Sequence, residues 1–138
     1  EVANWLMNQK REHLMRIANL RKHSIALQRG LQVNGRLETD LAVFYRVYQK
    51  DGVTQTALVA LNKSDEPAAV SVSELVSAGT WRDAFSGQPF QADNDTATLR
   101  VDVPAHGVRV LLFDDPVSNP RMLQRLDRLQ ATARRRTP

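Results

Sequence analysis

The sequence contains no cysteine, which excludes disulfide bonds and thiolate chemistry and leaves the compartment open. No apolar run comes near the roughly 18 residues of a membrane-spanning helix, and there is no signal-peptide pattern, so we expect no membrane partner. The first residue is Glu1 rather than Met, which predicts a start made by processing, by proteolysis or by choice of a fragment. With 138 residues and an ordinary apolar fraction, the chain has room for one domain with one core.

Ligand sets for metals and cofactors are also missing. The histidines His13, His23 and His106 are not at a metal-ligand spacing from one another, so we expect them to be solvated or to cap turns. Asp93-Asn94-Asp95 carries oxygen ligands for Ca²⁺, but no glycine and ligating glutamate follow at calcium-loop spacing, and a turn is expected. The sequence has no glycine-rich phosphate loop. It therefore predicts no metal site and no cofactor.

Catalytic motifs are equally scarce. We find no G-x-S-x-G motif and no Ser/His/Asp order of the kind that hydrolases use. The acidic pairs Asp65-Glu66 and Asp114-Asp115 are adjacent in the sequence, so their side chains diverge. Two carboxylates that act on one substrate must instead face each other about 5–10 Å apart. We therefore predict no catalytic residue in this chain.

The positive charge is concentrated at the two ends. Residues 1–30 carry six Lys/Arg against two acids, residues 31–113 seven against ten, and residues 114–138 six against three, which gives +4, −3 and +3. A nucleic-acid-binding domain usually carries its positive charge on the folded body, so no nucleic-acid partner is expected. The arginines of the tail are typical of a solvated face, and docking to an acidic protein surface is the alternative.

The N-terminal segment has helical periodicity. No glycine or proline occurs from Val2 to Arg29 and Gly30 is a suitable stop, so a helix is expected over residues 1 to about 27. Its apolar side comprises Trp5, Met7, Leu14, Ile17 and Ala18. A helix of this length is marginal alone. We expect this side to be covered by the tail helix or by a second copy of the chain, and we favour the homodimer.

The stretch from Gln55 to Val72 organises the middle of the chain. Residues 57–61 form a continuous apolar run, as in a strand buried on both faces, and the valines of residues 70–72 alternate with serine. Residues 62–67, NKSDEP, are turn chemistry. We predict a β-hairpin at the centre of an antiparallel sheet. The positions expected to be buried between two sheets are Leu58 or Val59, Leu61, Val101 and Val110.

Further strands are predicted on both sides of this stretch. They are expected over residues 41–48, 80–85, 99–103 and 108–113, with a hairpin turn at Asp51-Gly52 and polar loop at residues 91–95. Short strands with turn signals every ~8–12 residues predict a mainly β fold, an antiparallel β-sandwich. A helix over residues 117–134 follows, which Ser118 or Asn119 can cap. Its apolar stripe comprises Met122, Leu126, Leu129 and Ala133.

Three groups of residues, spread over about residues 10–113, match segments of one known family in their order and spacing. They are residues 21–30 (RKHSIALQRG), residues 59–67 (VALNKSDEP), and residues 81–87 (WRDAFSG) followed by 104–111 (PAHGVRVL). This set resembles the α-amylase family of glycoside hydrolases. The first group is similar to the R-K-x-H-P-A-L-x-x-G segment that ends the last helix of the catalytic barrel, with Ser24 where the family often has proline. The other groups are similar to a V-x-L-N-x-S-D-E-P hairpin and to the closing strands of the C-terminal domain.

The resemblance implies a division of the chain. Residues 1–30 would be the terminal helix of a catalytic barrel, residues 31–113 a C-terminal Greek-key β-sandwich (domain C), and residues 114–138 a linker and a basic amphipathic helix. The family, which includes cyclodextrin glucanotransferases, hydrolyses or transfers α-1,4-glucosidic bonds with carboxylates that lie on the barrel, upstream of Glu1. The implied role of this chain is to stabilise the barrel of the same parent protein, whose substrate would be an α-glucan.

Two other functions stay open at this point. A free-standing β-sandwich could hold glucan by stacking sugar faces on Trp81 and neighbouring rings, although 6% aromatic residues is low for such a surface. Trp81 is therefore the candidate sugar-contact residue. The second alternative is an interaction scaffold that uses the basic tail helix. A (β/α)8 barrel encoded upstream of Glu1 would favour the domain C interpretation over both.

Overall fold

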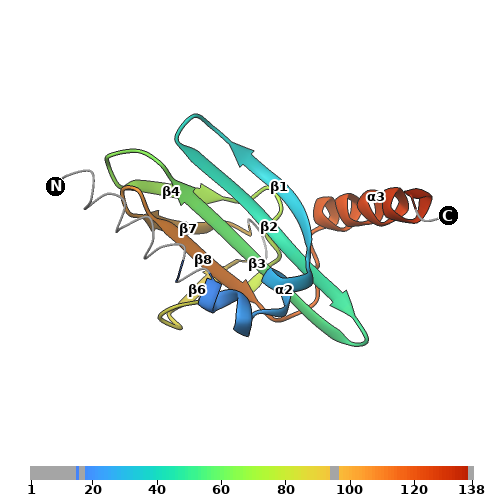
Figure 1. Cartoon of the computed structure of the whole chain (residues 1–138). Helices are drawn as coiled ribbons and strands as arrows, with labels where there is room; N and C mark the ends of the chain where they lie inside the picture. Colours follow the sequence, from blue (N-terminus) through green and yellow to red (C-terminus); the bar gives the residue numbers. More distant parts are fainter. Residues whose placement is uncertain (1–14, 16–17, 94–96, 137–138) are drawn as a thin grey trace.

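The computed structural model describes residues 15, 18–93 and 97–136 (Figure 1). Residues 18–23 are helical, and the elements that follow run to Arg136. In chain order they are α2 (Ile25–Arg29), β1 (Leu31–Leu37), β2 (Leu41–Lys50), β3 (Val53–Asn62), β4 (Ala68–Val72), β5 (Gly79–Asp83), β6 (Pro89–Ala92), β7 (Leu99–Val103), β8 (Val108–Phe113) and α3 (Pro120–Arg136).

The strands form two antiparallel sheets. A six-stranded sheet has the order β1-β2-β3-β8-β5-β6, and β4 pairs with β7 in a two-stranded sheet. Side chains from both sheets bury each other in the main core, which contains Tyr45, Leu58, Val70, Trp81 and Val101. The antiparallel β-sandwich predicted from the sequence is confirmed.

The predicted hairpin turn at Asp51-Gly52 is also confirmed. It joins β2 to β3, which pair in register from Leu41↔Asn62 to Lys50↔Val53. Asp51 and Gly52 both have positive φ, 54° and 79°, as a type I′ turn requires. The turn therefore places β3 beside β2 and fixes which side chains of each strand share a face.

The prediction that β3 and β4 form a hairpin is wrong. β3 pairs with β2 on one side and with β8 on the other, so it has no free edge for β4. Residues 63–67 instead carry the chain from the large sheet to the small one, where β4 pairs with β7. The strand itself is as predicted, because the run of residues 57–60 is buried on both faces of the sheet.

Two predicted core positions lie on the other face of the large sheet. Leu58 is fully buried in the main core, but Leu61 is only partly buried and packs on the outer face, and Val110 is buried there as well. The reason is the period of two along a strand, which places residues 58 and 61 on opposite faces. Strand β6 also corrects the prediction of a loop, since Gln91 and Ala92 pair with β5.

The N-terminal helix ends earlier than predicted. Ser24 has an extended backbone with φ −122° and ψ 115°, and its hydroxyl caps the separate short helix α2. The stripe residues Trp5, Met7, Leu14 and Ile17 lie outside the described residues, and Ala18 is exposed. The homodimer through the terminal helices therefore stays a prediction.

The tail helix α3 projects from one end of the sandwich (Figure 1). Asn119 is its N-cap, as predicted, because its side-chain oxygen accepts a hydrogen bond from Met122 N at 3.0 Å. Met122 and Leu126 are buried in the main core next to β1. Coverage of the N-terminal stripe by the tail helix stays a prediction, because most of the stripe lies outside the described residues. In the described part of the chain, no helix is long and apolar enough to cross a membrane.

Candidate functional site

A second apolar surface covers the outer face of the large sheet. Its buried sheet residues come from β3 and β8, and Leu20, Ala26 and Leu27 of the preceding segment pack on them. The buried sheet residues are Ala57, Val59, Val110 and Leu112, and the partly buried residues around them are Phe44, Tyr48, Leu61, Ala84 and Val108. This outer face is therefore covered at its centre by the chain that enters the sandwich, while its apolar rim is partly open.

The segment approaches the sheet closely at Gly30. A Cβ atom at this position would lie 2.8 Å from Val47 N, closer than real Cβ contacts allow. Arg46 extends over the same junction and donates a hydrogen bond from Nε to Gly30 O at 3.0 Å. Glycine is therefore required here by the space available, and the sequence signal for a helix stop was also a signal for a close contact.

A buried polar network fixes α2 to the sheet. Ser24 Oγ donates to Gln55 Oε1 at 2.7 Å, and Ala26 N donates to the same oxygen at 3.3 Å. Gln55 Nε2 donates to Asp114 Oδ1 at 2.9 Å, and Arg82 Nε donates to Asp114 Oδ2 at 3.1 Å. Burial alone would raise the pKa of Asp114, but these hydrogen bonds from Gln55 and Arg82 hold it below its usual value. The network joins the chain before β1 to the chain after β8.

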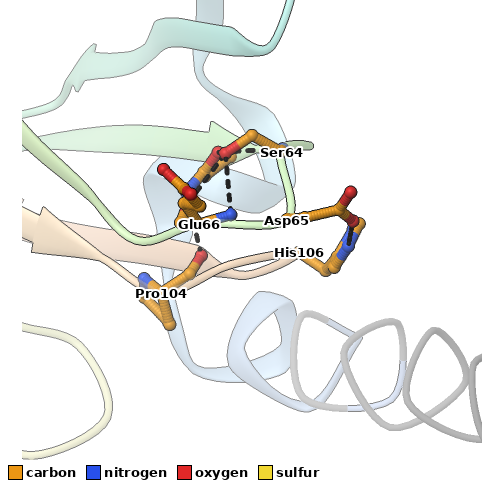
Figure 2. Close-up of polar contacts among 6 residues, drawn as sticks. Ser64, Asp65, Glu66, Pro104 and His106 are labelled. Carbon is orange, nitrogen blue, oxygen red and sulfur yellow. Dashed lines mark hydrogen bonds and ion pairs between the residues drawn. The ribbon is translucent and has the colours of Figure 1, made fainter.

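The turn that follows β3 is organised by Asn62, which is 3% exposed. Its Oδ1 accepts hydrogen bonds from Ser64 N at 3.0 Å and Ser64 Oγ at 2.8 Å. Its Nδ2 donates to Glu66 O at 2.8 Å and to Val103 O at 3.2 Å. Figure 2 shows Ser64 and Glu66 on this turn facing Pro104 of the β7–β8 connection. One amide therefore ties together the two connections that cross between the sheets.

We expect Asn62→Ala to lower the free energy of unfolding by about 1–3 kcal/mol. The substitution removes the acceptor of Ser64 N and leaves buried carbonyl groups without their donor, which costs about that much. Denaturant unfolding of the full chain measures it. Lys63→Ala, at the exposed neighbouring position, is the control and should stay within ±0.5 kcal/mol. Equal losses in the two variants would contradict the role of Asn62.

The WRDAFSG segment closes with a turn held by Asp83, which is 2% exposed. Its Oδ1 accepts from Phe85 N at 2.8 Å and Ser86 N at 2.9 Å, and its Oδ2 accepts from Arg109 Nη1 at 3.1 Å. Arg109 also donates to Asp102 O through Nη2 at 2.7 Å. Burial raises the pKa of Asp83, but the hydrogen bonds from Ser86, Phe85 and Arg109 outweigh it and hold the pKa below its usual value. Asp83 therefore acts as a structural anion.

The proposed sugar contact at Trp81 needs correction. The indole is 0% exposed, stacks on Phe113 with ring centroids 4.8 Å apart, and donates from Nε1 to Ser77 O at 3.0 Å. A sugar can stack only on a ring face that solvent reaches, and this ring has none. The apolar environment that made Trp81 a candidate is the interior of the sandwich.

The other residues considered as metal-binding or catalytic candidates lie apart from one another. His106 Nε2 lies 2.6 Å from Asp65 Oδ1 in an exposed hydrogen bond between the two connections of Figure 2. Asp114 belongs to the Gln55 network described above, and His23 and Asp93 are exposed. His13, Asn94 and Asp95 lie outside the described residues. Among the residues that the structure places, no three His, Asp or Glu side chains come close enough to hold a metal ion.

An arginine-lined groove, which the sequence did not predict, lies on another side of the molecule from the outer sheet face. It lies between β1, the loop after β4 and α3, and has a volume of about 530 Å³. The residues that line it are Gly35, Arg36, Glu74, Leu75, Arg121, Gln124, Arg125 and Arg128. The stripe of arginines on the tail was visible in the sequence. Their meeting with Arg36 was not, because it depends on where α3 packs.

The chain is thus a small β-sandwich domain. The segment that precedes β1 packs on the outer face of its large sheet. Residues 37–110, more than half of the chain, match the family model described as Maltogenic Amylase, C-terminal domain. The chain belongs to this family.

Solved structures share the fold at low identity. An α-amylase from Anoxybacillus is 17% identical, with a TM-score of 0.60, over 78% of this chain and 23% of that one. The α-amylase of Geobacillus thermoleovorans, solved with acarbose, is 21% identical, with a TM-score of 0.57, over 70% of this chain and 21% of that one. The α-galactosidase I of Mortierella vinacea has a TM-score of 0.50 at 21% identity over 69% of this chain and 27% of that one. The chain thus spans about a quarter of the proteins it matches, or less.

Proposed function

We propose that this chain is the non-catalytic C-terminal domain of an α-amylase-type enzyme acting on α-1,4-glucans. Residues 1–30 would be the terminal helix of the catalytic barrel, residues 31–113 the sandwich, and residues 114–138 a linker and basic helix. The sandwich stabilises the barrel of the same parent chain by covering part of its apolar surface. The family match and the likeness to the two α-amylases support the enzyme class.

The observation that carries this proposal is the outer face of the large sheet. Its centre already buries Leu20, Ala26 and Leu27 of the entering segment, and the Ser24–Gln55 hydrogen bond of 2.7 Å locks that segment in place. The partly buried residues at its rim offer further apolar area to a larger body that continues from the segment. A body docked there would be held at a fixed angle to the sandwich.

The test is a pair of substitutions at the rim of this face in the parent enzyme. Leu61 and Val108 are register partners on neighbouring strands, and both are only partly buried. We expect Leu61→Ser with Val108→Ser to speed thermal inactivation about tenfold more than the same pair destabilises the 138-residue chain, and this excess corresponds to ~1.4 kcal/mol of lost contact energy. The kcat/KM at low temperature should change less than about twofold, because the reacting groups are not touched. The 138-residue chain alone should release no reducing ends from maltoheptaose.

Leu37→Ser with Val53→Ser is the matched control. Leu37 and Val53 are 85% and 50% exposed on the same sheet, so the same chemical change should leave inactivation unaltered. Equal inactivation rates for the two pairs would refute docking at the outer face. Docking would also be refuted if the rim pair destabilised the 138-residue chain as strongly as the parent enzyme.

The alternative functions receive less support. A glucan-binding module that uses Trp81 would need an exposed ring, and this ring is 0% exposed. An interaction scaffold would use the basic tail helix, and its residues Arg121, Arg125 and Arg128 line a concave groove rather than a flat docking surface. That groove suggests a different kind of partner.

A further inference from the structure

The groove between β1 and α3 is strongly basic. Four arginines line it, with Glu74 as the one lining acid, so its net charge is +3. Its volume of about 530 Å³ falls within the roughly 300–1,000 Å³ of ligand pockets. Arg121, Arg125 and Arg128 follow each other at helical spacings of four and three residues, so like charges are held together on one face of α3 at a small cost in stability. An anion in the groove would offset that repulsion.

Two of the arginines are held in position by the protein. Arg36 Nη2 donates to Ser71 O at 3.0 Å, and Arg125 Nη2 donates to Asn34 O at 3.1 Å. Arg125 keeps its other donors for a ligand, whereas Arg36 also lies 3.8 Å from Glu38 and 3.6 Å from Glu74, so its charge is largely balanced within the protein. The helix that carries Arg125 is itself fixed, because Met122 and Leu126 are buried in the main core. The binding geometry would thus exist before the ligand arrives, which lowers the cost of binding.

The other two arginines are unpaired. The guanidinium groups of Arg121 and Arg128 have no hydrogen bond or ion pair with any residue that the structure describes, and both side chains are exposed. Arg128 accepts a hydrogen bond from Thr132 Oγ1 at 3.0 Å, but with its backbone oxygen. Glu74 lies 3.6 Å from Arg36 and is 49% exposed, so it neutralises one charge at one wall and leaves the α3 side uncompensated. The donors of Arg121, Arg125 and Arg128 therefore have no anionic partner within the described chain.

An unsatisfied hydroxyl lies behind the same wall. Tyr45 is 1% exposed and its hydroxyl has no hydrogen-bond partner. A Cβ at Gly35, a residue of the groove, would meet the Tyr45 ring at 3.2 Å, and the charged groups that act on the hydroxyl are Glu74 and Arg36 of the groove. The groove wall at Gly35 thus packs directly on the ring of a buried tyrosine.

We propose that this groove binds the phosphate groups of a small phosphorylated solute. A phosphate carries about −1.5 to −2 charge and three acceptor oxygens, which suits several converging guanidinium groups better than the single charge of a carboxylate. Arginine forks bind phosphate through paired hydrogen bonds. The concave shape favours a solute over a flat macromolecular surface. The inference concerns a surface away from the outer sheet face, and it does not depend on the proposed enzyme function.

Calorimetric titration of the full chain at low ionic strength tests the proposal, with inorganic pyrophosphate and glucose 6-phosphate as probes. We expect saturable binding of both. Arg121→Ala with Arg128→Ala should weaken it about tenfold or more, since two charge-assisted contacts are lost. Both side chains are exposed, so the melting temperature should match that of the unchanged chain.

The control removes the same charge elsewhere. Lys50→Ala with Lys63→Ala acts on exposed residues outside the groove and should keep the affinity within about twofold. No binding of either probe overturns the proposal, and so does equal weakening by the two pairs, which would mean unspecific attraction to net charge. Binding only to vesicles that contain phosphatidylinositol phosphate, or only to an acidic peptide, would reassign the groove to a membrane or a protein partner and overturn it as well.

Discussion

Replacing Leu58 with alanine is expected to lower the free energy of unfolding by about 2–5 kcal/mol, the range for a fully buried leucine. Leu58 is 0% exposed and lies in the main core, on a strand that has neighbours on both sides. Because β2 and β8 hold the backbone of β3 in place, the sheet cannot collapse into the cavity that the substitution leaves. Denaturant unfolding of the full chain, fitted with a common slope, measures the loss.

Leu61→Ala is the matched control on the same strand. Leu61 points to the outer face and is only partly buried, so its truncation should cost about 1 kcal/mol in the full chain. The comparison separates the two faces of β3 because the chemical change is identical. If Leu61→Ala cost as much as Leu58→Ala, the main core would not lie between the sheets as the structure has it.

The features predicted correctly from the sequence are local ones. Asp51-Gly52 supplies the two positive φ angles that a tight hairpin needs, and Asn119 supplies a side-chain acceptor at the start of α3. Strand β2 has alternating burial at Val43, Tyr45 and Val47 because the period of two fixes its face. Each of these signals is complete within a few residues, so no knowledge of the partner strand was needed.

The wrong predictions concern which strands pair with each other. The sequence shows that residues 70–72 alternate, but not that β3 has both edges occupied and that β4 must pair with β7. The same limit applies to Gln91, which is exposed and polar, yet belongs to β6 because β5 offers it an edge. Whether a strand edge is free to pair depends on the assembled sheet, and the periodicity of a single strand does not predict it.

At the candidate site, too, local features were predicted from the sequence and features that depend on packing were not. The turn chemistry of residues 62–67 predicted a connection, and Asn62 proved to organise it. Trp81 was chosen for its aromatic ring, but the alternation of β5 turns that ring into the core. The arginine groove combines Arg36 of β1 with the arginines of α3, which are about ninety residues apart. The burial of Met122 and Leu126 and the hydrogen bond from Arg125 to Asn34 O bring them together.

Replacing Asp83 with alanine is expected to cost about 3 kcal/mol of unfolding free energy. The change leaves Phe85 N and Ser86 N without their acceptor and takes from Arg109 its charged partner in a partly buried site. Asp83→Asn should cost less, because an amide oxygen in the place of Oδ1 can still accept both backbone hydrogen bonds and only the partner of Arg109 is lost. Asp102→Ala is the control, since Arg109 binds only the backbone oxygen of this exposed residue, and its effect should stay within ±0.5 kcal/mol.

The pH dependence of stability identifies the charge of Asp83 as the cause. Its pKa is lowered in the folded protein, because the hydrogen bonds from Ser86, Phe85 and Arg109 outweigh the effect of burial, which raises it. The unfolded chain therefore binds more protons, and the stabilisation is fully present above the unfolded pKa of about 3.9 and is lost as the pH falls through the folded pKa. Below about pH 5 the unchanged chain should lose stability more steeply than Asp83→Asn, while Asp114, whose pKa is also lowered, supplies the slope that remains in the variant. Parallel pH profiles for the two proteins would show that Asp83 holds its turn by geometry alone and that its charge contributes nothing.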